Sequence, residues 1–406
     1  MRRIQKAFQG SIVAIGFFFI IEMLCRMSWG APPTLESLVR VAQCSLRSEG
    51  GRSWMECGHP EDRVELSTEK TKPRVVVLGG SSVRDPFKAD PNDNFPEHLG
   101  RLMPRVEVVN LGKAGQSMAG VAWTASQLDS LKPDLVVIYE GHNDYAQTLF
   151  SGRISGTPLW TVPVLRILQN SWIFQKLTQE TRGVVVGPKR PQPVQHDPSL
   201  PPPPALCQQL PPSARRGVVM VEDDIALRVR DEVRERFRAD LTTAIRQSPA
   251  PVIVSTLLRN PEYPPGGVVG KDNSACGVAL GCMGSEHVTD HAELATYAEK
   301  VCGENSISLW LRSRARAEAG DQPGAIAAWR RSMELDAVPL RAPYVADEVV
   351  REVAGKTGAT LLDLEAALGP LPAASLFTDT LHPSTEGAEA IAQALLPVVQ
   401  GKLGSE

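Results

Sequence analysis

The chain has 406 residues, of which 42% are hydrophobic and 22% charged, and its formal net charge at pH 7 is -3. This size and composition are typical of a folded protein with one large core, and they exclude a fibrous or largely disordered chain. No block of Lys and Arg is long enough to neutralise a run of phosphates, so the charge pattern does not favour nucleic acid as a partner.

An apolar run from Gly10 to Leu24 follows three basic residues at the amino terminus, which is the pattern of an export signal. It predicts a membrane helix within residues 1–30. The run is shorter than the roughly 20 apolar residues of a spanning helix, so a signal peptide cleaved before Ala31 stays open beside an uncleaved anchor. We expect a membrane-anchored protein whose folded part is extracytoplasmic (periplasmic or at the cell surface), or secreted if the signal is cleaved.

Six cysteines follow this segment: Cys44, Cys57, Cys207, Cys276, Cys282 and Cys302. Their even number and the expected oxidising compartment favour disulfides, and Cys44/Cys57 and Cys276/Cys282 are the closest pairs, although the connectivity stays open. A metal site is the alternative, because His at i and i+4 share a helix face. Its candidate ligands are Cys276, Cys282, His287 and His291. Their spacing matches no zinc signature, and we expect neither metal nor cofactor.

Short apolar, β-branched runs predict five buried parallel strands, at 74–78, 106–110, 135–139, 252–256 and 360–363. The stretches between them are long enough to hold helices. This alternation predicts an α/β fold, a three-layer α/β/α sandwich whose sheet is covered on both faces. In such sheets ligands bind beyond the carboxyl ends of the strands, so the residues that follow each run are the first candidates for a site.

The other segments predict additions to this domain. A near four-residue apolar period predicts a helix from Asp224 to Arg246, and the stretch from Ser308 to Leu335 resembles one tetratricopeptide unit, a candidate surface for a protein partner. The expected organisation after residue 30 is an extracytoplasmic linker (31–72), the first part of the main domain (73–150), a Pro-rich insertion (151–223), a continuation of the domain (224–265), a helical tetratricopeptide-like insertion (266–345) and the C-terminal part of the domain (346–400).

A Gly turn, GGSS at residues 79–82, follows the first predicted strand and places Ser81 at the carboxyl edge of the sheet. Gly-Ser turns are common, and a loop without function is the simplest interpretation. Backbone N–H groups in such a turn could also bind phosphate. Neither GxGxxG nor a complete GxxxxGK[ST] is present, however, so nucleotide binding is not expected.

Three further blocks carry polar groups to the same edge. Gly115 lies in NLGKAGQS after the second strand, and Asn143, an amide donor, lies in GHND after the third. The segment DTLHP places Asp379 three residues before His382, a spacing that lets the carboxylate hold one imidazole nitrogen while the other faces a nucleophile. Each block alone has an ordinary structural interpretation.

Together, the four blocks resemble those of the SGNH/GDSL hydrolase superfamily, which is named for its Ser, Gly, Asn and His residues. The resemblance implies a flavodoxin-like five-stranded parallel sheet. It also implies that Ser81 is the nucleophile, His382 the general base and Asp379 its orienting partner. The oxyanion hole would then consist of the N–H groups of Ser81 and Gly115 and the amide of Asn143.

The chain departs from the family at Gly80, where many members have the Asp of GDS, and Ser82 is the fallback nucleophile. The stretches STLLRN, ending at Asn260, and DAVPLRAP, which contains Arg341, look like segments of exported members that carry tetratricopeptide-like helices. This likeness implies that Asn260 and Arg341 contact the substrate. For Arg341 a structural ion pair is an equal alternative.

The resemblance implies a serine-dependent esterase that forms an acyl-enzyme on Ser81. The expected compartment makes an acylated small molecule or a cell-envelope glycan the substrate class. A glycan O-acyltransferase would use the same triad. An alternative of another class is a non-catalytic glycan-binding module of the envelope.

Overall fold

The computed structural model describes residues 44–49, 52–57, 63–66, 70–85, 88, 90, 92–151, 219–221, 230–269 and 290–404. All of them belong to one compact unit, formed by Val41–Gly156 and Pro191–Glu406. The predicted signal segment and nearly all of the Pro-rich insertion lie outside the described residues. No helix in the described part of the chain is both long and apolar enough to cross a membrane.

The centre of the fold is a five-stranded parallel sheet with the order β10-β8-β6-β4-β5. Its strands are β4 (Arg74–Gly79), β5 (Glu107–Asn110), β6 (Leu135–Tyr139), β8 (Val252–Ser255) and β10 (Thr360–Leu362). Each predicted strand is confirmed, with ends that differ by at most one residue. Numbered along the chain, the order is 2-1-3-4-5, which is flavodoxin-like, and its switch point lies between β4 and β6, where such sheets bind ligands.

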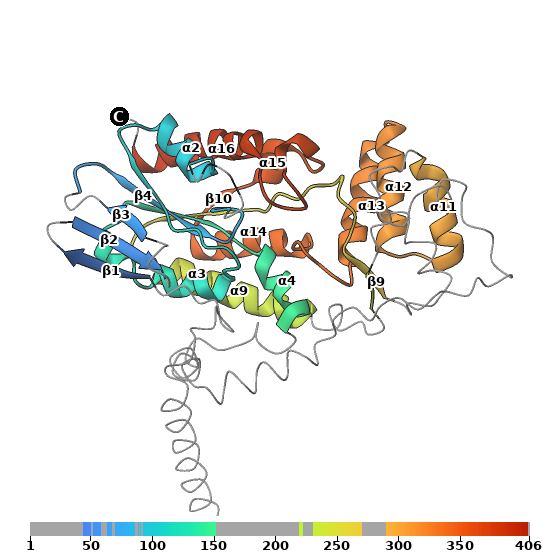
Figure 1. Cartoon of the computed structure of the whole chain (residues 1–406), viewed down its shortest axis with the longest axis horizontal. Coiled ribbons are helices and arrows are strands. Elements are labelled where there is room, and N and C mark those ends of the chain that lie inside the picture. The colour runs from blue at the N-terminus through green and yellow to red at the C-terminus, as the bar shows by residue number, and fades with distance from the viewer. Residues whose placement is uncertain are drawn as a thin grey trace, which may run out of the picture. The chain divides into compact units, whose positions relative to one another are not determined.

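Helices cover both faces of the sheet, as Figure 1 shows. One layer contains α2 (Phe95–Leu102), α15 (Leu364–Leu368) and α16 (Thr385–Leu403), and the other contains α3 (Met118–Ala125), α9 (Arg230–Gln247) and α14 (Val345–Thr357). Helix α9 lies where the four-residue period predicts a helix and buries Val233, Phe237 and Leu241. The α/β class and the covered sheet are therefore confirmed.

The segment predicted as a linker contains secondary structure of its own. Strands β1 (Cys44–Glu49), β2 (Arg52–Cys57) and β3 (Arg63–Leu66) form an antiparallel sheet, in which Cys44 lies opposite Cys57. Strands β1 and β2 escaped prediction because CSLRSE and RSWMEC contain no β-branched residue, and β3, RVEL, is only four residues long. A pair of short parallel strands, β7 (Val219–Val221) and β9 (Gly267–Val269), was also not predicted.

The helical insertion contains α11 (His291–Cys302), α12 (Ser306–Glu318) and α13 (Gln322–Glu334). Helices α12 and α13 are the pair that the tetratricopeptide-like stretch predicts. They pack with α11 around a separate apolar cluster that includes Trp310, Leu311 and Trp329. Cys302, at the end of α11, is disulfide-bonded.

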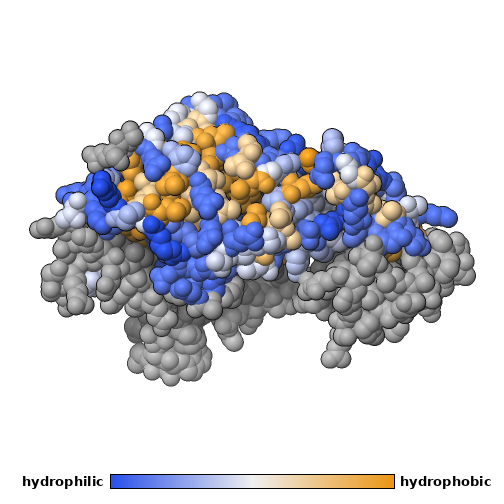
Figure 2. Space-filling view, turned by 90° about the horizontal axis from the view of Figure 1, so that it is seen from above, coloured by the Kyte–Doolittle hydropathy of each residue, from blue (hydrophilic) through white to orange (hydrophobic). Residues whose placement is uncertain are grey.

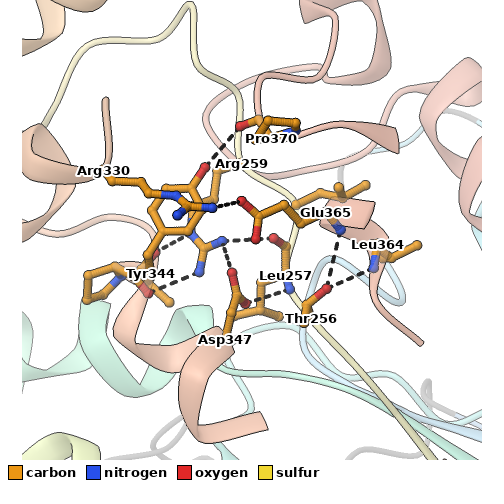
Figure 3. Close-up of polar contacts among 12 residues, drawn as sticks. Thr256, Leu257, Arg259, Arg330, Tyr344, Asp347, Leu364, Glu365 and Pro370 are labelled. Atoms are coloured by element: carbon orange, nitrogen blue, oxygen red, sulfur yellow. Dashed lines mark hydrogen bonds and ion pairs between the residues drawn. The ribbon is translucent and has the colours of Figure 1, made fainter. Parts of the chain in front are cut away.

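A buried polar network joins this insertion to the sheet domain (Figure 3). The ring of Tyr344 lies between two guanidinium groups, with Arg259 at 4.6 Å and Arg330 of α13 at 5.0 Å from its centroid. Trp329 donates a hydrogen bond to the Tyr344 hydroxyl (3.1 Å). Arg259 forms a 2.6 Å ion pair with Asp347 of α14, whose side chain has no exposed surface. The insertion is therefore fixed to the segment that follows β8.

We expect Asp347→Ala to lower the free energy of unfolding by about 3–5 kcal/mol, because it leaves a buried charge without its partner. The substitution also removes the acceptor of the Leu257 N–H (2.9 Å). Urea unfolding measures this loss. The matched control is Lys356→Ala on the same helix, where the ion pair with Glu352 is exposed and should contribute less than about 1 kcal/mol. If both substitutions lowered the free energy of unfolding equally, the interpretation of Arg259–Asp347 as a stabilising buried ion pair would be wrong.

The face covered by α2 and α16 carries apolar side chains at its surface. Figure 2 shows it from outside, with apolar residues gathered between hydrophilic ones. Leu102, at the end of α2, is among the large apolar side chains that are most exposed in the described part of the chain. Other apolar residues of α16 are buried, including Ile391, Leu395 and Val399.

Candidate active site

The turn after β4 presents Ser81 at the carboxyl edge of the sheet. The N–H groups of Val83 and Arg84 both donate to the carbonyl of Gly80 (3.1 and 3.2 Å), which closes the turn tightly. The N–H of Lys113 donates to the carbonyl of Gly79 (2.9 Å) and joins this turn to the loop that follows β5. Ser81 is partly exposed, whereas Ser82 is buried.

Ser81, His382 and Asp379 form a hydrogen-bonded chain. The Ser81 Oγ lies 2.8 Å from His382 Nε2, and His382 Nδ1 lies 2.6 Å from Asp379 Oδ2. The other carboxylate oxygen, Asp379 Oδ1, accepts the N–H groups of Leu381 and His382, each at 2.9 Å. The two nitrogens of the imidazole therefore face a hydroxyl and a fixed carboxylate, which is the geometry of a nucleophile, a base and an orienting group.

The shifts in the pKa values of Asp379 and His382 suit this arrangement. Burial acts to raise the pKa of Asp379, but the hydrogen bonds from the His382 ring and from the two N–H groups outweigh it and lower this pKa to about 2. Burial acts to lower the pKa of His382, but the hydrogen bond and the charge of Asp379, with help from Asp85, raise it above its ordinary value. The carboxylate is therefore ionised at neutral pH and stabilises an imidazolium beside it.

The two other blocks meet at the same edge. Gly115 adopts a positive φ of 71°, which favours glycine, in a turn closed by the N–H of Gln116 donating to Lys113 (3.0 Å). The Asn143 side-chain amide donates to the carbonyl of Gln116 (2.8 Å), and the carboxylate of Asp144 accepts the N–H of Met118 (3.0 Å). The GHND turn is therefore joined to the loop that carries Gly115.

The side chains of Asn260 and Arg341 lie inside the protein. Asn260 donates its amide to the carbonyl of Asp379 (2.9 Å), and its N–H donates to Thr380 (3.0 Å). Arg341, 1% exposed, donates to the carbonyls of Asn260 (2.9 Å) and Tyr263 (2.6 Å). Asn260 therefore holds the loop of the triad carboxylate, and Arg341 holds the segment that carries Asn260. Contact with the substrate stays an untested prediction.

The alternative of a metal site draws no support from the described residues, which contain no group of three or more His, Cys, Asp and Glu suited to a metal ion. His291 lies on α11, where its Nδ1 is 2.7 Å from a carboxylate oxygen of Glu318. The other candidate ligands, Cys276, Cys282 and His287, lie outside the described residues.

Two buried residues of the site were not singled out from the sequence. His142 accepts the N–H of Ala342 at Nδ1 (3.1 Å), and burial lowers its pKa well below the ordinary value, so its ring is neutral. Glu140, immediately after β6, is 4% exposed. The signal for Glu140 was available, because a carboxylate directly follows a wholly apolar predicted strand.

Comparisons with known proteins identify similar solved structures. Neither a family model nor a curated protein matches the chain. A lipase/acylhydrolase from Enterococcus faecalis is 13% identical with a TM-score of 0.35, and the match covers 81% of this chain and 96% of that one. An acetylxylan esterase from Geobacillus stearothermophilus, solved as a catalytic mutant, is 13% identical with a TM-score of 0.35, covering 83% and 98%.

A lipolytic protein of the G-D-S-L family from Veillonella parvula is 10% identical with a TM-score of 0.35, and the match covers 80% of this chain and 97% of that one. These likenesses are distant. The sheet order, the sequence of the four blocks along the chain and the contacts of Ser81, His382 and Asp379 are all those that the sequence resemblance implies. The chain thus has a flavodoxin-like α/β fold, with Ser81, His382 and Asp379 in the hydrogen-bonded arrangement that the sequence resemblance implies.

Proposed function

We propose that the chain is a serine-dependent ester hydrolase that forms an acyl-enzyme on Ser81. The observation that carries this proposal is the chain of hydrogen bonds from the Ser81 hydroxyl through His382 to Asp379, at 2.8 and 2.6 Å. A pocket that merely binds a glycan needs no nucleophile, base and orienting carboxylate in contact. This favours an enzyme over a binding module.

In the first half of the reaction, Ser81 Oγ forms a bond to the ester carbonyl carbon while its proton passes to His382 Nε2. Asp379 stabilises the imidazolium that results. The tetrahedral intermediate then collapses, the bond from carbon to the alcohol oxygen breaks, and His382 returns its proton to the departing oxygen. The acyl group stays on Ser81.

In the second half, water replaces the alcohol. His382 takes a proton from the water as its oxygen attacks the acyl carbon, and the bond to Ser81 Oγ breaks as that oxygen regains the proton. In both halves we assign the oxyanion to the N–H groups of Ser81 and Gly115 and to the Asn143 amide. In the structure one hydrogen of that amide bonds the Gln116 carbonyl, which fixes the plane of the amide, and the amide also faces the Glu140 carboxyl.

Asn143→Ala should lower kcat by about 10²–10³-fold, since the loss of one oxyanion donor has this effect in serine hydrolases. The melting temperature should change little, because Asn143, in the first turn of α4 (His142–Ser151), is only partly buried. The matched control is Gln127→Ala, which removes another partly buried amide, one that donates to the carbonyl of Trp123 (3.2 Å) where α3 ends. This variant should keep kcat. A kcat equal to that of wild type in Asn143→Ala would remove this amide from the oxyanion hole.

For the substrate, we propose an acylated glycan or small molecule outside the cytoplasm. The apolar amino-terminal run supports membrane anchoring and export, and the disulfide at Cys302 supports an oxidising compartment. The helical insertion is the proposed surface for a protein partner. The triad serves transfer to a sugar hydroxyl as well as hydrolysis, so the acceptor has to be tested directly.

The experiment measures release of p-nitrophenol from p-nitrophenyl acetate by the full chain in detergent, with and without an oligosaccharide acceptor. Hydrolysis without acceptor supports an esterase. Acetylated oligosaccharide among the products would instead assign a transferase. The absence of both reactions, together with an unreactive Ser81, would contradict the proposed function.

A further inference from the structure

The carboxyl group of Glu140 lies between the two turns of the site. It accepts the N–H of Asn143 at 3.3 Å, and it also interacts with the N–H groups of Gly80 and Gly141 and with the Asn143 amide. Gly80 immediately precedes Ser81. One buried carboxyl therefore contacts both the turn that carries the nucleophile and the turn that carries the amide assigned to the oxyanion hole.

The same carboxyl occupies the space beside Gly80. A Cβ atom added at Gly80 would lie 2.3 Å from Glu140 Oε2 and 2.5 Å from Asn143 Nδ2, far inside contact distance. A side chain at residue 80 therefore requires the ends of the Glu140 and Asn143 side chains to shift. At this position many SGNH/GDSL members have the Asp of GDS, whereas this chain has glycine and, immediately after the neighbouring strand β6, Glu140.

The buried position of Glu140 is energetically unfavourable for a carboxylate. Glu140 is 4% exposed, and within the described part of the chain it forms no ion pair. Burial raises its pKa to about 7, against the hydrogen bonds from the N–H groups, and burial likewise raises the pKa of Asp144 well above its ordinary value, with a contribution from the charge of Glu140. Amide or apolar side chains would avoid this desolvation.

We propose that Glu140 is a positioning residue for the reaction proposed above, whose carboxylate replaces a side chain at position 80 and holds the Ser81 turn against the Asn143 turn. The distance from the nucleophile to the oxyanion donors then depends on Glu140. Because a misplacement of about 1 Å can cost on the order of 100-fold in rate, the expected effect falls on kcat and not on KM.

The test removes the carboxylate from position 140 and, in a second step, places one at position 80. Glu140→Gln and Glu140→Ala should each lower kcat for p-nitrophenyl acetate by about 10- to 100-fold with KM within about threefold of wild type. Gly80→Asp alone should also be impaired, because its side chain collides with Glu140 and Asn143. The double variant Gly80→Asp/Glu140→Ala removes the nearer of the two colliding side chains and restores a carboxylate, and its kcat should exceed that of Gly80→Asp by at least about tenfold.

Asp336→Asn is the matched control. Asp336 is a carboxylate of 1% exposure that accepts the N–H groups of Gly266, Gly267 and Val338, away from the triad. It should lose thermal stability and keep kcat. The isosteric Glu140→Gln keeps the test decisive if Glu140→Ala does not fold.

Three results would overturn the inference: a wild-type kcat in Glu140→Gln, an equal fall of kcat in Asp336→Asn, or a double variant no better than Gly80→Asp. If the proposed esterase function is itself wrong, the wild-type chain will neither hydrolyse the ester nor react at Ser81 with a fluorophosphonate. This result differs from the three above, so the two failures can be told apart.

Discussion

Ser81→Ala should lower kcat for p-nitrophenyl acetate by on the order of 10⁵-fold or more, the scale of the loss when a serine hydrolase loses its nucleophile. The reason is chemical, because the hydroxyl that contacts the base is that of Ser81, whose Oγ lies 2.8 Å from His382 Nε2. Folding should be unaffected, since Ser81 is partly exposed. The measurement is the steady-state rate of p-nitrophenol release by both proteins at equal concentration.

Ser82→Ala is the control for this prediction, because it removes the neighbouring hydroxyl that the sequence leaves as the fallback nucleophile. Ser82 is buried. We expect its loss to leave kcat within a few-fold of wild type. If activity disappears with Ser82 and survives the loss of Ser81, the assignment of the nucleophile is wrong.

Asp379→Asn should lower kcat by about 10⁴-fold, the effect of the equivalent change in a serine protease triad, where the wrong imidazole tautomer results. Here Asp379 Oδ2 accepts the proton of His382 Nδ1 at 2.6 Å. An asparagine that turns its NH₂ toward the ring would force that proton to Nε2, which could then no longer accept the proton of Ser81. The remaining activity of Asp379→Asn is measured at several enzyme concentrations, to distinguish it from the activity of a contaminant.

The same substitution should change the pH profile. His382 must be neutral to act as a base, and its pKa is raised, so wild-type kcat/KM should fall as pH falls through a pKa above the ordinary value. Without the hydrogen bond and charge of Asp379, burial lowers that pKa, and the acid limb should move to lower pH. An acid limb that stays in place would show that Asp379 does not control His382.

Much of the fold follows from local pattern. The strands of the central sheet, such as Leu135–Tyr139, are β-branched runs buried on both faces, and this pattern is visible without tertiary information. The small antiparallel sheet is different. Its strands are mixed in polarity, and pairing between segments determines them more than composition does.

The residues of the site also divide into those that local sequence predicts and those whose contacts only the tertiary structure shows. Ser81, Asn143 and the DTLHP segment could be found because each follows a predictable strand or precedes a predictable helix, and parallel strands bring their carboxyl ends together. The contacts of Asn260 with Asp379 and of Arg341 with Asn260 depend on the path of loops across the fold. The resemblance of their segments to family members implies substrate contact for both, whereas in the structure their side chains donate to backbone carbonyls.

The most direct test of the central claim is covalent labelling of the full chain with a fluorophosphonate, followed by peptide mass spectrometry. The reagent reacts readily with a serine whose hydroxyl is activated by a base and hardly at all with ordinary serines. We predict a single adduct on the peptide that contains Ser81, lost in Ser81→Ala and strongly slowed in Asp379→Asn. A chain that is folded but unlabelled at Ser81 would contradict the proposal that Ser81, His382 and Asp379 form a working triad.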